Sequence, residues 1–147
     1  MTGVQTCALP ILIDATIRSS LAERADYASN SLVHSYPRGL DVEVFTADAL
    51  ERASTAAKEK YQRTHVTPYL YEHAELFKLV SVTGEVDHSE YRWTLDTSED
   101  WELIRAIYKH FENRDDFRWF EVLKLMEDQP ELAALNSHVR QKTLREG

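Results

Sequence analysis

The sequence has a single cysteine, Cys7, and no apolar run that approaches the roughly 20 residues of a membrane span. One cysteine excludes an intrachain disulfide and fits a reducing compartment, so we expect a cytoplasmic protein without a membrane partner. Basic residues are also scarce, since 17 lysines and arginines against 25 acidic residues give a formal net charge of -8. We therefore expect no nucleic-acid partner, because neutralising phosphates requires clustered cations. A nucleotide substrate is still compatible, since a metal ion can bridge acidic side chains to phosphates.

Several common sequence signatures are missing as well. The chain has no GxxxxGK[ST] phosphate loop, no GxGxxG, no GxSxG and no cluster of cysteines and histidines with metal-site spacing. What is present is an ordinary globular composition, 43% hydrophobic and 29% charged over 147 residues, which is enough for one domain with a sizeable core. Residue spacing alone supports only an α/β domain with a candidate acidic cleft.

The first eleven residues are unlike the rest. Residues 1–11 have neither the basic flank nor the long apolar core of a signal peptide. They resemble a string that recurs at the start of unrelated proteins translated from assembled reads, where adapter sequence has been translated. We therefore interpret residues 1–11 as a non-native scar and residues 12–147 as the domain. The alternative is a short native strand over residues 7–13.

Periodic patterns predict alternating helices and strands after residue 11. Asp14 can cap a helix to about Arg24, with Ile17 and Leu21 on its buried face. Strands are predicted over residues 25–30, 40–45 and 77–82. Further helices are predicted at 46–60 with Thr46 as cap, from 66 or 67 onward, at 97–111 and at 117–126, followed by a turn at Pro130 and a polar tail.

Asp96 lies between two contrasting patterns. Residues 91–95 alternate as a short strand does, and Trp101, Ile104 and Tyr108 then recur at helical spacing. An acid at the end of a strand and before a helix sits where open α/β sheets place ligands. Asp96 can be an N-cap or a carboxylate directed at a divalent cation, and spacing alone favours the cap, because such caps are common.

Other polar residues also allow two interpretations. Residues 40–45 place Asp41 and Glu43 on one face, either solvated at a sheet edge or lining a pocket for hydroxyls or a cation. Arg63 and His65 precede the helix predicted near Pro68, where anions and hydroxyls are readily bound. The alternative for His65 is a surface residue with one backbone hydrogen bond.

Five stretches together resemble the cytidylyltransferase family that makes CMP-activated sugars, in particular its spore coat polysaccharide and acylneuraminate-type members. They are, in order, ADYASN (25–30), YPRGLDVEVF (36–45), RTHVTPYLY (63–71), RWTLDTSEDWELI (92–104) and NSHVRQK (136–142). The resemblance implies a three-layer α/β/α Rossmann-like nucleotidyltransferase fold. It implies transfer of CMP from CTP to a sugar acid or related sugar for surface polysaccharide biosynthesis, with Mg²⁺ and release of pyrophosphate, and it leaves room for a homodimer.

The resemblance also implies roles for particular residues. Asp96 occupies the position of the aspartate in the family's D-T-x-E-D motif, which helps to hold magnesium, so metal ligand becomes the favoured interpretation and Thr97 or Ser98 can supply the cap. The residues that match regions facing the sugar are Arg38, Asp41, Glu43, His65 and Tyr69.

The chain departs from the family pattern near its start. The family opens with a basic glycine-rich loop of the type A-R-x-G-S-x-R-L-P-x-K, which is absent here, and Leu9 stands where its G-D-x-P-L-I-D segment has the other magnesium ligand. We therefore expect an inactive, N-terminally truncated, C-terminal portion of the enzyme. Two alternatives are a non-catalytic sugar-binding module and a metal-dependent glycosyltransferase.

Overall fold

The computed structural model describes residues 8–143 and divides the chain into two compact units. The sheet unit contains residues 14–33, 42–82 and 140–143. The helical unit contains residues 8–13, 34–41 and 83–139.

The sheet unit is built on three short strands, β1 (Tyr27–Ser29), β2 (Glu43–Phe45) and β3 (Leu79–Ser81), in the order β2-β1-β3. β1 pairs antiparallel with β2 and parallel with β3, so the sheet is mixed. All of β1 is buried, as expected for a central strand covered on both faces. The α/β class is therefore confirmed, and each strand lies inside a range predicted from the sequence, although regular pairing covers only three residues of each.

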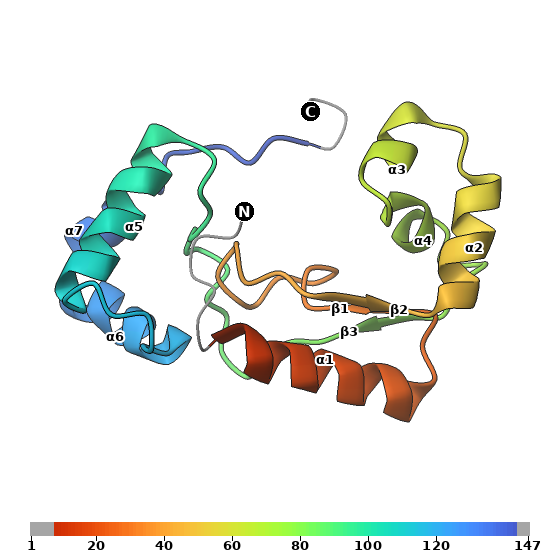
Figure 1. Cartoon of the computed structure of the whole chain (residues 1–147), viewed down its shortest axis with the longest axis horizontal. Helices are drawn as coiled ribbons and strands as arrows, with labels where there is room; N and C mark the ends of the chain where they lie inside the picture. Colours follow the sequence, from red (N-terminus) through yellow and green to blue (C-terminus); the bar gives the residue numbers. More distant parts are fainter. Residues whose placement is uncertain (1–7, 144–147) are drawn as a thin grey trace. The chain divides into compact units, whose positions relative to one another are not determined.

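Three helices of the sheet unit, α2 (Ala47–Ala56), α3 (Lys60–Thr64) and α4 (Pro68–Glu72), gather at one end of it (Figure 1). Thr46 caps α2 as predicted, because its Oγ1 accepts a hydrogen bond of 3.1 Å from the Ala49 amide. Pro68 occupies the first turn of α4, also as predicted. The helix predicted to reach residue 60 ends at Ala56, and α3 then begins separately. The core of the unit consists of Tyr27, Ala49, Ala53, Leu70 and Phe77.

Helix α1 (Ala8–Glu23) corrects the sequence prediction. It begins inside the segment interpreted as a scar, so Asp14 is an exposed residue within the helix and not its cap. The side chains predicted to be buried are exposed, Ile17 by 39% and Leu21 by 73%, while Thr16 and Ser20 are buried. Successive residues of a helix are about 100° apart, so a shift of one residue turns another row inward. That row holds Leu12 followed by the hydroxyl residues Thr16 and Ser20, so a pattern of apolar residues does not identify it.

The helical unit contains α5 (Ser98–His110), α6 (Trp119–Asp128) and α7 (Pro130–Ala134), and α7 packs against both of the others (Figure 1). The sequence places Trp119, Val122, Leu123 and Met126 on one stripe of α6, and the structure buries the last three and leaves Trp119 half-buried. In α5 Ile104 is buried, Tyr108 is half-buried and Trp101 is 52% exposed. The buried residues of α5 are Asp100, Leu103, Ile104 and Ile107.

Residues 91–95 do not form the predicted strand. Their regular pairing is a single parallel bridge between Arg92 and Arg38. The Arg38 amide donates to the Tyr91 carbonyl at 3.0 Å, and the Trp93 amide donates to the Arg38 carbonyl at 2.8 Å. Pairing stops there because the chain turns at Gly39, whose φ is +100°, in the left-handed region that favours glycine.

No helix within residues 8–143 combines the length and the apolar character needed to cross a membrane.

The tight approach at Gly39 makes it sensitive to a single methyl group. A Cβ at this position would lie 2.5 Å from the Trp93 carbonyl oxygen, and alanine also disfavours the positive φ. We expect Gly39→Ala to lower the free energy of unfolding by about 2 kcal/mol or more, measured by urea denaturation. Gly84→Ala is the matched control, because a Cβ there meets its nearest atoms at 3.4 Å and no positive φ is involved. Equal stability of the two variants would contradict this account of the turn.

Candidate functional site

A buried ion pair lies at the start of α5, where Asp100 is fully buried and Arg92 nearly so. The Arg92 guanidinium binds the carboxylate in a bidentate way, from Nε to Oδ1 and from a terminal nitrogen to Oδ2, both at 3.0 Å. The same carboxylate accepts hydrogen bonds from the Thr94 hydroxyl at 2.7 Å, the Asp96 amide at 3.0 Å and the Asn136 side-chain amide at 2.8 Å. The loop before α5 and the residues after α7 are thus tied to one carboxylate.

The hydrogen bonds decide the charge of Asp100. Burial by itself raises the pKa of this carboxyl, but the bonds from Arg92, Thr94, Asp96 and Asn136 outweigh that effect. They hold the pKa of Asp100 well below its usual range, because every one of them stabilises the ionised form. Asp100 is therefore a permanent anion that pairs with the permanent cation Arg92.

This network places Asp96 at the surface. The N-cap of α5 is Thr97, whose Oγ1 accepts from the Asp100 amide at 3.3 Å, so the expectation that Thr97 can supply the cap is confirmed. The Asp96 side chain is 61% exposed, and its Oδ2 accepts a hydrogen bond of 3.2 Å from Arg92. Its backbone is fixed and its carboxylate faces solvent, so Asp96 can take an external ligand. No group of three or more potential metal-binding side chains occurs in the part of the chain that the structure describes.

Arg38 and Asp41 lie on the same turn of the helical unit and share a neighbour, His34. A terminal nitrogen of Arg38 is 3.4 Å from His34 Nε2, and His34 Nδ1 is 3.9 Å from Asp41 Oδ1. The Gly39 amide donates to Asp41 Oδ2 at 3.2 Å. Two of the predicted sugar-facing residues are thus brought together by a histidine that the sequence analysis did not single out.

Glu43 belongs to the sheet unit, where it has different partners. Its Oε1 accepts a hydrogen bond of 2.5 Å from the Tyr27 hydroxyl and one of 3.0 Å from the Thr67 hydroxyl. Burial, reinforced by the Glu43 charge, raises the pKa of Tyr27 far above its usual value and raises the pKa of Tyr71 to about 12. The Tyr27 phenol therefore stays protonated and donates to Glu43 at any physiological pH.

The structure does not join His65 or Tyr69 to Glu43 by any described contact. His65 is exposed at the end of α3, where its amide donates to the Tyr61 carbonyl at 2.9 Å. Tyr69 is half-buried and stacks on the His73 ring, with 4.0 Å between the ring centroids. From this stretch of the chain it is Thr67 that reaches Glu43.

Most of the partners that the sequence analysis missed lie inside the stretches that carried the family resemblance. Tyr27, Thr67, Arg92, Asp100 and Asn136 all fall within those five segments. The signal was therefore present, but a resemblance marks a segment and does not say which side chain in it makes the contact. His34 lies outside all five segments.

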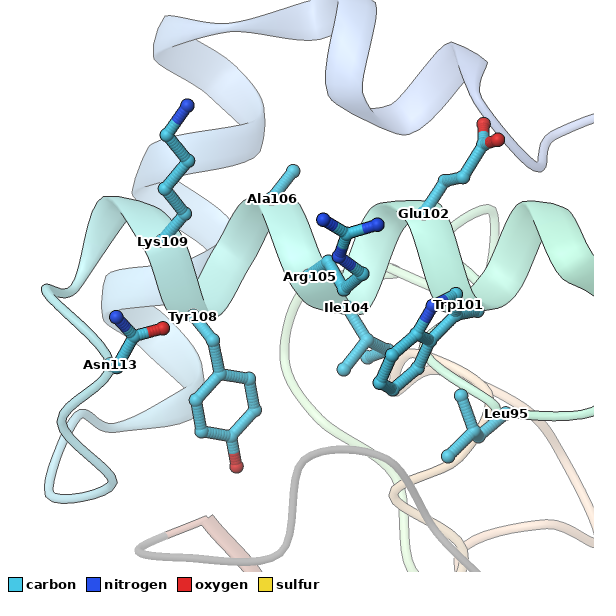
Figure 2. Close-up of a pocket in the computed structure, with 9 residues that line it drawn as sticks. All are labelled: Leu95, Trp101, Glu102, Ile104, Arg105, Ala106, Tyr108, Lys109 and Asn113. Carbon is cyan, nitrogen blue, oxygen red and sulfur yellow. The ribbon is translucent and has the colours of Figure 1, made fainter.

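A pocket of about 720 Å³ lies along α5, lined among others by Trp101, Arg105, Tyr108 and Lys109 (Figure 2). Leu95, the residue before Asp96, also lines it, with its side chain near that of Trp101. None of the six predicted site residues lines this pocket, so it is separate from the candidate substrate contacts.

Comparisons with known proteins agree on one family. A family model described as cytidylyltransferase matches residues 2–136. The uncharacterized protein MJ1063 of Methanocaldococcus jannaschii is 40% identical over 92% of this chain and 55% of its own length. The spore coat polysaccharide biosynthesis protein SpsF of Bacillus subtilis is 30% identical over 90% of this chain and 55% of its own length. The chain thus spans about half the length of these curated relatives.

A solved structure is also similar. The cytidylyltransferase from Leptospira borgpetersenii serovar Hardjo-bovis (strain JB197) superposes with a TM-score of 0.76 at 26% identity. The superposition covers 92% of this chain and 54% of that one. The fold of the matched part is therefore shared.

Because the Arg92–Asp100 pair is buried, we expect a large loss of stability when the charge of Asp100 is removed. Asp100→Asn removes the buried, bidentate counter-ion of Arg92 and leaves it only the exposed Asp96 carboxylate, so we expect the free energy of unfolding at neutral pH to fall by about 3–5 kcal/mol, measured in urea. Asp116→Asn is the matched control, because the Arg114–Asp116 pair is exposed, and a change below about 1 kcal/mol is expected there.

The lowered pKa of Asp100 also predicts how the stability of the protein depends on pH. The folded pKa of Asp100 is lowered, so its stabilising effect is complete above the unfolded value of about 3.9 and is lost as the pH falls toward the folded value. The stability difference between wild type and Asp100→Asn should therefore narrow below about pH 4. A difference that stays constant down to the acid transition would contradict a lowered pKa.

Proposed function

Because this chain belongs to the cytidylyltransferase family, we propose that it takes part in transferring CMP from CTP to a sugar acid or related sugar for surface polysaccharide biosynthesis. The observation that carries the proposal is the family match over residues 2–136. The name of the Bacillus subtilis relative supports the polysaccharide pathway. Family membership favours this function over a metal-dependent glycosyltransferase.

The role of Asp96 in this proposal is to bind magnesium. Its exposed carboxylate is held by Arg92 and by the fixed start of α5, and it has the oxygen ligands that Mg²⁺ prefers. One carboxylate fits the ion only together with other ligands, and magnesium in such sites is commonly completed by waters and substrate phosphates. When bound, the ion would neutralise charge on the triphosphate. The Arg92 contact fixes the direction of the Asp96 carboxylate before any ligand binds.

The remaining predicted residues would bind the sugar. Arg38 offers guanidinium donors to an acid group, and Asp41 offers a carboxylate to a hydroxyl. Glu43 holds Oε1 toward Tyr27 and Thr67, which leaves Oε2 for a hydroxyl of the substrate. His65 and Tyr69 stay in the proposal as a donor or acceptor and an aromatic surface from the α3–α4 segment. In the transfer itself, a sugar hydroxyl bonds to the α-phosphorus of CTP and pyrophosphate leaves.

The test uses the Methanocaldococcus jannaschii relative as a host. The segment of that relative that this chain matches is replaced by this chain, and the chimera supplies the part that the chain does not span. With Mg²⁺, CTP and a panel of sugar acids and neutral sugars, we expect release of pyrophosphate that depends on the sugar. A folded chimera that releases none with any sugar would contradict the proposed transfer.

Asp96→Asn in the chimera tests the metal ligand. Thr97, not Asp96, caps α5, and the Asp96 side chain is largely exposed, so the melting temperature should stay unchanged. Pyrophosphate release should fall about 100-fold or more, the scale of losing one strong electrostatic contact in a transition state. Asp115→Asn, an exposed acid in the turn after α5, is the matched control and should keep full activity. Full activity in Asp96→Asn would show that this carboxylate holds no essential metal.

A further inference from the structure

His34 is a titratable residue to which the proposed function assigns no role. It lies on the helical unit four residues before Arg38, and its two ring nitrogens face groups of opposite charge. Nε2 is 3.4 Å from an Arg38 guanidinium nitrogen, and Nδ1 is 3.9 Å from Asp41 Oδ1. Among the described residues, Arg38 and Asp41 are the charged groups that act on this histidine.

The contact with Arg38 fixes the protonation state. A guanidinium has only donors, so the 3.4 Å contact is attractive only when Nε2 carries no proton and accepts. The single ring proton is then on Nδ1, the nitrogen that faces the Asp41 carboxylate. The pKa of His34 supports this arrangement, because burial lowers it from the ordinary 6.5, Arg38 lowers it further, and Asp41 opposes both.

The two charged partners are themselves well oriented. The Arg38 main chain is bridged to Tyr91 and Trp93, and the Asp41 carboxylate accepts from the Gly39 amide within the same turn. A cation that offers paired N–H donors and a carboxylate that accepts from hydroxyls suit a ligand with both an acid and a hydroxyl group. His34 lies between them and touches the cation through one nitrogen only.

We propose that His34 is a positioning residue whose neutral imidazole holds the Arg38 guanidinium so that Arg38 and Asp41 bind the carboxylate and a hydroxyl of a sugar acid. This inference rests on the proposed function, since it assumes that the Arg38 and Asp41 region binds the sugar. Protonation of His34 places an N–H against the guanidinium and expels it. Binding of the acid therefore weakens as the pH falls through the pKa of His34, which burial and Arg38 hold below the ordinary 6.5.

The experiment uses the 147-residue chain and N-acetylneuraminate as the sugar-acid probe, with N-acetylmannosamine as the neutral comparison. Binding is followed by the NMR shift of the Gly39 amide at about pH 7.5 and about pH 4.5, the second well below the ordinary histidine pKa because the pKa of His34 is lowered. Wild type should bind the acid about tenfold more weakly at the lower pH, on the scale of one charge-assisted hydrogen bond. The neutral sugar should show no such dependence on pH.

Three variants distinguish a positioning role of His34 from a purely structural one. His34→Ala should lose about tenfold in affinity at the higher pH and lose the pH dependence, because no acceptor is left for Arg38. His34→Gln restores a neutral acceptor, so it should recover most of the affinity at both pH values. His110→Ala, at the exposed end of α5, is the matched control and should behave as wild type.

A second measurement reports on the geometry without any ligand. The imidazole of His34 should titrate below pH 6.5 in wild type, and Arg38→Gln should raise its midpoint. An unshifted midpoint, or acid binding that is independent of pH in wild type, would overturn the proposal. So would failure of the acid to bind at either pH. Intact, pH-dependent acid binding in the chain together with a chimera that releases no pyrophosphate would contradict cytidylyl transfer and leave the His34 assignment standing.

Discussion

The bidentate ion pair between Arg92 and Asp100 is the interaction on which the helical unit depends. It joins the loop before α5 to the first turn of that helix, and Asn136 attaches the residues after α7 to the same carboxylate. Asn136 also donates to the Arg92 carbonyl at 2.8 Å, so it binds both members of the pair. Removing either charge would leave the other buried without its bidentate counter-ion.

Such a pair contributes more to geometry than to net stability. Moving both charges out of water costs several kcal/mol per ion, and the hydrogen bonds around them largely offset that cost. The main effect of the pair is therefore to orient Arg92, because a bidentate contact fixes the plane of its guanidinium group. The Arg92 side chain then binds Asp96 through a terminal nitrogen, and the main chain on either side of Arg92 binds Arg38, so both candidate site residues are held next to this one residue. A candidate site held in this way is preorganised by contacts that involve no ligand.

Local signals in the sequence were sufficient for the elements that depend on neighbouring residues. The cap at Thr46 and the proline start of α4 are set within three or four residues of the chain, so short patterns predict them. At α5 spacing alone favoured Asp96 as the cap, which was wrong, because Thr97 is the cap. The buried face of α1 depended on which row packs inward, and the hydroxyl row of Thr16 and Ser20 has no apolar signature. The partners of Asp100 span 36 residues to Asn136, and those of Glu43 span 24 to Thr67, so no local pattern contains them.

The central claim is that Arg92 and Asp100 act as one unit, and a double-mutant cycle measures this directly. The free energy of unfolding is determined in urea for wild type, Arg92→Met, Asp100→Asn and the double variant. The account predicts strongly non-additive changes, with a coupling energy of about 2 kcal/mol or more, because the second substitution removes the buried charge whose bidentate partner the first removed. Changes that add to within about 0.5 kcal/mol would show two independent residues and contradict the account.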